Sequence, residues 1–587
     1  MLTATARVMH IPRAVTTRAP ARDAGPVIAD RIVEQLRAAL EAAGLPEPER
    51  GIEVTQARHR DHGDWQTNVA LVLAKPVGVS PREVASRIVA ALDAAPPPHV
   101  ERVEIAGPGF CNFFLAPTWL HAVLREVVDA GERYGRGDCY AGLRVNLEFV
   151  SANPTGPLHA GGGRWVAVGD AIANLLAAQG AEVHREYYLN DAGTQLDAFG
   201  ASLHARYRGE APPGDGYHGE YLLDMADRMR TELGDDVSLA ATREWGYHDV
   251  VRQLRDDLGR IGVHFDTWFS ELLLHERGDV AAVLADLEAG GHTYEADGAT
   301  WLRSEALGDQ RDRVLVRGDG GTTYLTSDLA YHRDKLRRGF DHLVDIWGAD
   351  HHGQVKSLQV GMRALGYGSV DAPEPEILLG QLVKLERGGE LVRLSKRAGE
   401  VITLADILDA VDPDVCRLAF LLQGIDTAQT FDLDVVTAQS MENPVYYVQY
   451  AHARIASIGR RAAEAGVTRG ELGDVELSLL VHERELDLLR ALAEYPDVLV
   501  HAAETRAPHR VATWVRDFAS RFHGFYRDCR VLTDDPALTR ARLWLTEACR
   551  IGLADALAIL GVSAPEVMER LDGDPANSDG AAETDVP

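Results

Sequence analysis

Apolar and polar positions divide the chain into three regions with different patterns. From 27 to 117 the pattern opens with apolar residues at helical spacing, and Gly44 supplies the stop after Ile28, Ile32, Val33, Leu36 and Leu40. It closes at 103–110, where apolar and polar residues alternate before a Gly-Pro break. The region therefore predicts a small α/β domain whose last element is an edge strand.

The second region, 140–404, alternates strand-like and helix-like segments. Residues 144–150 have period two, and 164–179 carry apolar residues at helical spacing (Val168, Ile172, Leu175, Leu176) before a stop at Gly180. Alternation of this kind predicts a parallel sheet. A charged helical stretch at about 217–258 indicates an insertion between the halves of that sheet.

The third region, 405–571, shows several long amphipathic patterns and no strand pattern, which predicts an all-α bundle. The acidic, Gly/Ala-rich segment 572–587 predicts a disordered tail. Residues 1–26 hold several arginines and no acid before Asp23, but they lack the hydrophobic core of a signal peptide. We expect a flexible N-terminus there rather than a transit peptide.

Net charge and cysteine content bear on nucleic-acid binding, metal binding and cellular compartment. The 587 residues carry a formal net charge of −29, which argues against a general nucleic-acid coat but not against a local basic face. Residues 506–550 hold nine arginines against five acids and are one candidate for such a face; a solvated helical surface is the alternative. Apolar runs fall short of the ~20 residues of a membrane span. The five cysteines include no CxxC pair, so we expect no structural metal and a reducing, cytoplasmic location.

A glycine-rich turn marks the start of the second region's first helix, in Pro154-Thr155-Gly156-Pro157-Leu158-His159-Ala160-Gly161-Gly162-Gly163-Arg164. A turn between a strand and a helix directs main-chain N–H groups and the helix dipole toward an anion. Gly-Lys-Ser/Thr is absent, so the turn is not a P-loop. Val166 stands where a dinucleotide fingerprint needs its third glycine. A glycine-rich turn with a purely structural role is the alternative.

A second signature lies far downstream. Lys396 is one of five lysines in the chain and lies in Arg393-Leu394-Ser395-Lys396-Arg397. A His/Gly loop followed by a Ser-Lys loop resembles the signature pair of the class I aminoacyl-tRNA synthetases. Further segments are similar to those of arginyl-tRNA synthetases in order and spacing, namely 146–157, 188–195, 324–331, 348–353, 442–454 and 557–568.

This resemblance spans about 27–571 and implies the fold class. It is an α/β protein with a class I Rossmann-like catalytic domain, a small N-terminal α/β domain and an all-α C-terminal anticodon-binding bundle. In that family the N-terminal domain touches the tRNA elbow. The expected activity is that of an arginine–tRNA ligase, which forms arginyl-adenylate from L-arginine and ATP with Mg2+ and transfers arginine to the 3′ end of arginine tRNA. The family is usually monomeric.

The resemblance also implies which residues bind ATP. His159 and Lys396, with Ser395, would act on the phosphates, and the binding set would be Pro157, His159, Gly161, Gly162, Gly163, His352, Arg393 and Lys396. Catalysis would consist of placing the reactants and stabilising phosphoryl charge. Two positions depart from the family pattern. Gly162 replaces the second histidine of His-x-Gly-His, and Arg393 replaces the first lysine of the downstream loop. Arg164 or Trp165 are candidates to compensate for the missing histidine.

Arginine recognition asks for carboxylates, because a guanidinium pairs best with planar, partly desolvated acids. Tyr324 and Asp328 are four residues apart and would share one face of a helix. By the resemblance they hold the guanidinium, with Glu148 assisting. Ser151 and Asn153 would orient the α-amino and carboxylate groups, and Asp350 would lie by the amino acid. Taken singly, each carboxylate could equally be structural.

Tyrosines beside an arginine suggest contact with tRNA near the start of the third region. Tyr446, Tyr450 and Arg454 are our predicted contacts there, because aromatic rings can stack on unpaired bases while a cation meets phosphate. Packing inside the bundle is the alternative. In the N-terminal domain the predicted tRNA contact is Asn68, which ends the segment 62–68.

Other functions stay open at this point. A nucleotidyltransferase that adenylates a small acid without RNA would share the sheet, although it would not need the helical third region. A synthetase-like paralogue with a regulatory, resistance or biosynthetic role would fit Gly162 and Arg393. An arginyl-tRNA synthetase copy that supplies a biosynthetic pathway would have the same residues.

Overall fold

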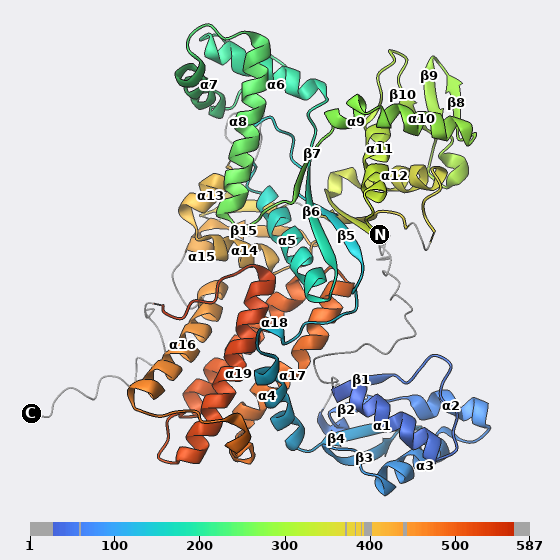
Figure 1. The fold of residues 1–587 in the computed structure, drawn as a ribbon, viewed down its shortest axis with the longest axis vertical. Coiled ribbons are helices and arrows are strands. Elements are labelled where there is room, and N and C mark those ends of the chain that lie inside the picture. The colour runs from blue at the N-terminus through green and yellow to red at the C-terminus, as the bar shows by residue number, and fades with distance from the viewer. Residues whose placement is uncertain are drawn as a thin grey trace, which may run out of the picture.

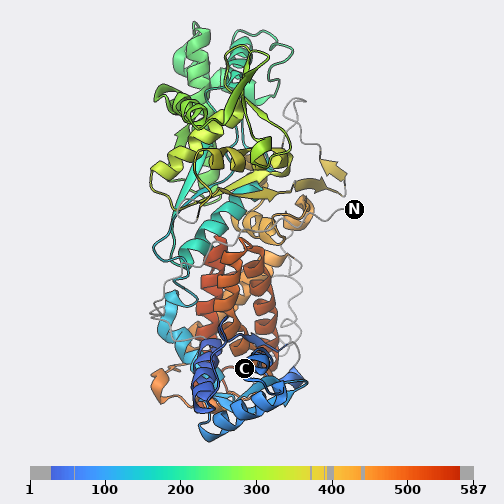
Figure 2. The ribbon, with the colours of Figure 1, turned by 90° about the vertical axis from the view of Figure 1, so that its right-hand side faces the viewer.

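The computed structural model describes residues 28–57, 60–369, 373–381, 383–388, 390–392, 402–437 and 443–568. The described parts form an elongated molecule (Figures 1 and 2). The insertion helices α6–α8 lie at one end, and the N-terminal domain lies beside the C-terminal bundle at the other end. No described helix is both long and apolar enough to cross a membrane.

The N-terminal domain is an antiparallel sheet with three helices. Its strands are β1 (Val54–Gln56), β2 (Trp65–Thr67), β3 (Val100–Ala106) and β4 (Phe110–Leu115), in the order β1-β2-β4-β3. The helices are α1 (Ile28–Ala42), α2 (Val69–Val77) and α3 (Pro81–Ala94). β3 pairs with β4 alone and ends the sheet, which confirms the edge strand predicted at 103–110.

Helix α4 (Thr118–Ala130) connects this domain to the rest and packs on two helices of the C-terminal bundle, α17 (Glu483–Glu504) and α19 (Pro536–Leu560). Just after it, the Tyr134 hydroxyl donates to the carbonyl of Leu492 at 2.6 Å, and Arg136 pairs with Asp555 at 2.6 Å. The chain between the two predicted domains is thus part of the bundle's surface.

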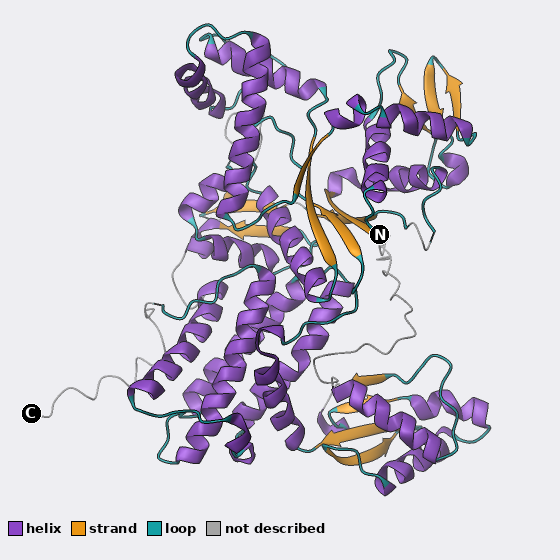
Figure 3. Cartoon of the chain, viewed as in Figure 1, coloured by secondary structure: helices purple, strands orange, loops and turns teal. Residues whose placement is uncertain are grey.

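The centre of the molecule is a five-stranded parallel sheet in the order β12-β11-β5-β6-β7 (Figure 3). Its strands are β5 (Arg144–Glu148), β6 (Glu182–Leu189), β7 (Thr267–Ser270), β11 (His342–Gly348) and β12 (Glu376–Gly380). Helix α5 (Gly162–Ala178) packs on β5 and β6, and α11 (Tyr324–Arg337) packs on β11. The strand order reverses between β5 and β11, and such a switch point is where parallel sheets bind ligands.

Strand β5 is a buried strand of this sheet. The last four of its five residues are all buried, because β5 lies between β6 and β11 and has protein on both faces. The prediction of a strand at 144–150 is confirmed for 144–148, and burial of its side chains on both faces agrees with the predicted parallel sheet.

Two insertions interrupt the sheet. Helices α6 (Thr194–Tyr207), α7 (Tyr221–Leu233) and α8 (Leu239–Arg260) pack together between β6 and β7, so the helical cluster begins before residue 217. A second insertion between β7 and α11 was not foreseen. It contains α9 (Leu272–Glu276), α10 (Asp279–Ala289) and an antiparallel sheet of β8 (Thr293–Ala296), β9 (Ala299–Leu302) and β10 (Arg313–Val316).

After α12 (His352–Ala364) and β12, three short strands form a small sheet of β13 (Val383–Arg387), β14 (Glu390–Val392) and β15 (Gln429–Asp432). β15 lies within 405–571, so the expectation that this region lacks strands was wrong. A four-residue strand is too short to show a hydrophobic period. The parallel partner β13 completes it.

The rest of the C-terminal part is helical (Figure 3). Its helices are α13 (Leu404–Ala410), α14 (Pro413–Leu421), α15 (Leu433–Thr437), α16 (Pro444–Glu464), α17, α18 (His509–Asp528) and α19. The bundle is joined to the sheet by the buried Arg506, whose guanidinium pairs with Glu376 of β12 at 2.9 Å. This arginine of the 506–550 stretch therefore belongs to an internal contact and not to an RNA-facing surface.

Candidate active site

A cavity of about 770 Å3 lies at the carboxyl ends of β5, β6 and β11, at the switch point of the sheet. Cavities of this size accommodate small metabolites. Five of the residues predicted to bind arginine are among its lining: Glu148, Ser151, Asn153, Tyr324 and Asp328. They come from the end of β5, the loop after it, and α11, which are distant in sequence.

The loop that leaves β5 has an unusual main-chain conformation. Val150 has φ 71° and Ser151 has φ 39°, a region that β-branched and other non-glycine residues rarely adopt. The buried Tyr187 holds this turn, since its hydroxyl donates to the carbonyl of Ala152 at 3.0 Å and accepts the N–H of Ala152 at 3.0 Å. Strain of this kind persists where the surrounding structure enforces it, often at functional sites.

Polar side chains at the loop are connected to one another. The Ser151 hydroxyl donates to Glu148 at 2.9 Å and accepts the N–H of Tyr188 at 3.1 Å. The Asn153 amide donates to Gln195 at 2.7 Å. The groups expected to orient the amino acid's α-amino and carboxylate groups are therefore held in place before any ligand binds.

The His159 turn starts helix α5. The Gly161 N–H donates to His159 Nδ1 at 2.9 Å, and the Gly162 N–H donates to the His159 carbonyl at 2.7 Å. Because Nδ1 accepts, a neutral His159 carries its proton on Nε2. The 770 Å3 cavity is not lined by this turn, that is, by Pro157, His159 or the three glycines. The turn follows strand β5, whose last residue does line the cavity.

The glycines of this turn are required by internal packing. A Cβ on Gly162 would lie 2.9 Å from Leu158 Cδ1, and a Cβ on Gly163 would lie 2.9 Å from a ring atom of Phe420 and 3.0 Å from Leu404. At positions 162 and 163 the absent Cβ faces protein atoms.

The same turn pairs with a segment from far downstream. The Ala160 N–H donates to the Ile402 carbonyl at 3.0 Å, and the Leu404 N–H donates to the Leu158 carbonyl at 2.7 Å. Residues 393–401 immediately precede this pairing. They contain Arg393, Ser395 and Lys396, which lie outside the described residues.

Neither candidate for compensating the missing histidine lies in its place. Arg164 is buried and donates to main-chain carbonyls of the 424–427 turn at 2.7 and 2.8 Å. The Trp165 ring lies against Gly380, where a Cβ would come within 1.8 Å of it. The side chain that packs beside Gly162 is that of Leu158 and not that of Trp165.

Tyr324 and Asp328 lie one turn apart on α11, which confirms that this stretch is helical. The Tyr324 side chain is 59% exposed at the cavity. In the described part of the chain, no hydrogen bond or ion pair reaches the Asp328 carboxylate. Burial raises the pKa of Asp328 to about 7. The positive charge of His332 opposes this shift, whereas the negative charges of Glu148, Glu271 and Asp345 add to it. An unpaired acid in such a place favours a cationic ligand.

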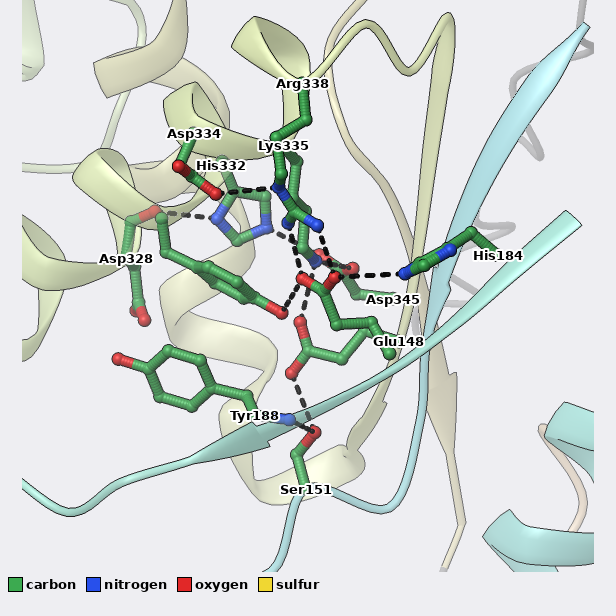
Figure 4. A network of polar contacts seen from close by, with 12 residues as sticks. Glu148, Ser151, His184, Tyr188, Asp328, His332, Asp334, Lys335, Arg338 and Asp345 are labelled. Atoms are coloured by element: carbon green, nitrogen blue, oxygen red, sulfur yellow. Dashed lines mark hydrogen bonds and ion pairs between the residues drawn. The ribbon is translucent and has the colours of Figure 1, made fainter. Parts of the chain in front are cut away.

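A buried charge network lies beneath Asp328 (Figure 4). Lys335 Nζ lies 2.7 Å from Glu148 and 2.7 Å from Asp345, and His332 Nε2 lies 2.5 Å from Asp345. His332 Nδ1 donates to the main-chain carbonyl of Asp328 at 2.7 Å. Lys335, His332 and Asp345 escaped sequence reasoning, although the spacing of Asp328, His332 and Lys335 along one helix was a usable signal.

Glu271 was also missed. It directly follows β7, so it lies at the carboxyl edge of the sheet, and it is buried. Burial, followed by the charge of Glu271 and its hydrogen bond to the phenol, raises the pKa of Tyr188, which lines the cavity. Its position at a strand's carboxyl end was the only sequence signal that could have indicated it.

Asp350 and His352 are two further predicted residues that do not line the cavity. The Asp350 carboxylate is 75% exposed and lies 3.5 Å from His351. Asp350 and His352 are both absent from the cavity lining, whereas His351 and Gln354 of the same turn contribute to it. No cluster of three metal-ligating side chains occurs among the residues that the structure describes.

Two of the predicted tRNA contacts of the bundle, Tyr450 and Arg454, pack on each other. Tyr450 is 7% exposed, and the Arg454 guanidinium lies 4.6 Å from the Tyr450 ring centre and 4.3 Å from that of Tyr526. Tyr446 is partly exposed on the same helix, α16. Asn68 is partly buried at the N-cap position of α2 and makes no side-chain cap bond.

Three family models match the chain along its length. The arginyl tRNA synthetase N terminal domain matches residues 30–115, the catalytic domain of class I (R) tRNA synthetases matches 240–418, and the DALR anticodon binding domain matches 448–568. The order of the three agrees with the three regions read from the hydrophobic pattern.

Curated relatives agree over most of the chain. An arginine–tRNA ligase of Syntrophotalea carbinolica is 47% identical over 89% of this chain and 95% of its own, and one of Frankia alni is 47% identical over 88% and 95%. The solved Thermus thermophilus arginyl-tRNA synthetase shares the fold, with a TM-score of 0.70 and 23% identity over 92% of this chain and 100% of its own. These findings confirm both the resemblance and the fold class predicted from the signature segments. The chain belongs to the arginyl-tRNA synthetases, a family of class I aminoacyl-tRNA synthetases.

Proposed function

We propose that this protein is an arginine–tRNA ligase. It forms arginyl-adenylate and pyrophosphate from L-arginine and ATP, and then transfers the arginyl group to the terminal ribose of arginine tRNA. Asp328 carries this proposal, because it is a carboxylate without an ion-pair partner among the described residues, in a cavity at the switch point of a class I sheet. A guanidinium supplies the charge that this carboxylate lacks.

In the first step an oxygen of arginine's carboxylate attacks the α-phosphorus of ATP, and the bond from that phosphorus to pyrophosphate breaks. No proton moves, so the protein's task is to place the two reactants and stabilise charge on the phosphates. In the second step a ribose hydroxyl attacks the arginyl carbonyl carbon. AMP leaves, and the hydroxyl proton is released.

The arginine subsite in this proposal runs from Asp328 to the loop after β5. Asp328 and Tyr324 hold the guanidinium, while Ser151 and Asn153 orient the α-amino and carboxylate groups. The Ser151 hydroxyl is oriented by its hydrogen bond to Glu148, and the Asn153 amide by its hydrogen bond to Gln195. Both side chains therefore have a fixed orientation at the pocket, which supports this assignment. Asp350 lies in the turn after β11 and would reach the ligand only after that turn moves.

The ATP subsite lies at the His159 turn and the segment that pairs with it. ATP with Mg2+ is the expected substrate, and its phosphates would meet the N-terminus of α5. The set of residues proposed for this subsite is Pro157, His159, Gly161, Gly162, Gly163, His352, Arg393, Ser395 and Lys396. Lys396 neutralises charge on the phosphates as pyrophosphate leaves.

Arginine tRNA is the proposed macromolecular partner. The DALR match and the long helices of the third region support binding of the anticodon by the bundle, with Tyr446, Tyr450 and Arg454 as candidates. Asn68 is the candidate in the N-terminal domain. We further propose a monomer that acts in the cytoplasm. The five cysteines support a reducing compartment, because none of them forms a disulfide.

One specific observation favours a second function, that of a catalytically weak paralogue. Gly162 stands in the place of the family's second signature histidine, and neither Arg164 nor Trp165 substitutes for it. Aminoacylation of total tRNA with each of the twenty amino acids decides between the two. Charging with arginine alone supports the ligase, charging with another amino acid contradicts the specificity, and arginine binding without charging favours the paralogue.

A further inference from the structure

Lys335 is a fully buried cation beneath the arginine pocket. Its ammonium lies 2.7 Å from Glu148 Oε2, 2.7 Å from Asp345 Oδ1 and 4.2 Å from the centre of the Tyr331 ring. Burial by itself lowers the pKa of Lys335, but the charges of Asp345 and Glu148 raise it above its usual value. The side chain is therefore charged, and its donors are directed at protein groups.

His332 is a second cation of this cluster. Nδ1 faces the carbonyl oxygen of Asp328 and Nε2 faces the carboxylate of Asp345 (Figure 4). Both partners are acceptors, and Lys335 also donates to Asp345, so both ring nitrogens carry a proton. The cluster of Glu148, His332, Lys335 and Asp345 thus holds two positive and two negative charges.

Two further acids near the pocket, Glu186 and Glu271, also have partners. Glu186 receives two hydrogen bonds from Arg338, at 2.6 and 2.7 Å, and one from the Tyr331 hydroxyl at 2.8 Å. Glu271 interacts with the Tyr188 hydroxyl. Among the described acids that line the pocket, Asp328 and Asp215 lack both an ion-pair partner and a side-chain hydrogen bond, and Asp215 is exposed to solvent. The arrangement therefore offers a cationic ligand one partly buried free carboxylate, that of Asp328.

We infer that Lys335 is a specificity-determining positioning residue. By pairing with Glu148 and Asp345, its ammonium neutralises both acids, so that the guanidinium is drawn to Asp328 and Glu148 only assists as a hydrogen-bond acceptor. The inference rests on the proposed function, since it concerns arginine as the ligand. Without Lys335, a free Glu148 carboxylate would attract any ligand that ends in an ammonium, such as lysine or ornithine.

The test is a double-mutant cycle on the full-length protein, with the affinities for arginine and lysine measured by titration calorimetry. Lys335→Met keeps the length of the side chain and removes its charge. We expect it to lower the arginine-to-lysine affinity ratio by about tenfold or more. Adding Glu148→Gln removes the freed charge while leaving an acceptor for the Ser151 hydroxyl. The double variant should return the ratio to within about threefold of the wild type.

The same cycle can start from Glu148→Gln, which provides a test if the single variant Lys335→Met fails to fold. Glu148→Gln leaves the Lys335 charge partly unpaired and should weaken arginine binding about tenfold. Adding Lys335→Met should recover that loss. Lys75→Met is the matched control, because Lys75 is exposed on α2 of the N-terminal domain, and it should leave both affinities unchanged.

An unchanged ratio in Lys335→Met, or a double variant no better than Glu148→Gln, would overturn the role of Lys335. In that case wild-type binding of arginine and charging of tRNA would still stand. Wild-type protein that binds no arginine would instead refute the proposed function, and the inference would fail with it. The two failures are distinguished by the wild-type titration.

Discussion

The main chains of His159 and Thr403 face each other in an antiparallel bridge, although the two residues lie in different regions of the sequence. Thr403 also caps α13 in a reciprocal arrangement, in which its hydroxyl accepts the Asp406 N–H and Asp406 accepts the Thr403 N–H. This bridge anchors the end of the segment that carries Lys396. In the sequence, Lys396 lies seven residues before Thr403.

Lys396→Ala should lower the rate of arginine activation by about two to four orders of magnitude, because a charge partner of the phosphates is removed. Pyrophosphate exchange in the presence of tRNA measures the rate. Calorimetry should find arginine affinity nearly unchanged, since the arginine subsite lies around Asp328. Lys384→Ala, at an exposed lysine of β13, is the control. A rate close to that of the wild type would remove Lys396 from the phosphate subsite.

Asp328→Asn keeps the shape of the side chain and removes the charge that faces the guanidinium. The loss of arginine affinity should be roughly 2–5 kcal/mol, as for a buried charge pair deprived of one partner. Citrulline is nearly isosteric with arginine but neutral, so its affinity should change far less. Titration of both ligands against both proteins gives the comparison, and equal losses would mean that Asp328 does not contact the side chain.

Arginine binding should depend on pH through the same residue. Burial raises the pKa of Asp328 to about 7 in the free protein. The guanidinium stays charged throughout, so it pairs with the ionised carboxylate, which predominates above pH 7 and is lost as pH falls through 7. Between pH 8 and pH 6 the arginine affinity should therefore fall about tenfold. Calorimetry across this range measures the slope, and Asp328→Asn should flatten it.

His159→Ala should reduce arginine activation by about 100-fold or more, because no second imidazole is present in the turn. The side chain has two separable tasks, since Nδ1 also accepts the Gly161 N–H. His159→Asn retains an acceptor for that N–H but has no imidazole. Pyrophosphate exchange by the two variants separates the tasks: an active Asn variant would show that His159 serves only to shape the turn.

The signature segments predicted the fold class, because each segment consists of residues adjacent in the chain. Five of the residues predicted from them to bind arginine line one cavity. The pairing of Lys335 with Glu148 and Asp345 could not be predicted, since it requires the register of β5 against β11. β15 was missed because a four-residue strand forms only through its partner β13. The packing of Leu158 against Gly162 could not be predicted for a similar reason, since the two residues meet only after the turn has folded.

The last prediction concerns the histidine that Gly162 replaces. Gly162→His should not raise the activity above that of the wild type, because the new Cβ would lie 2.9 Å from Leu158 Cδ1 and Leu158 is buried. Displacing Leu158 should lower the free energy of unfolding by about 1–3 kcal/mol, the usual effect of overpacking. Gly162→Ala is the matched control, since it adds the same Cβ without an imidazole. Thermal unfolding and pyrophosphate exchange of both variants provide the comparison. If the histidine variant were faster than the wild type while the alanine variant were slower, the vacant position would limit the enzyme, and Leu158 would be the residue that yields.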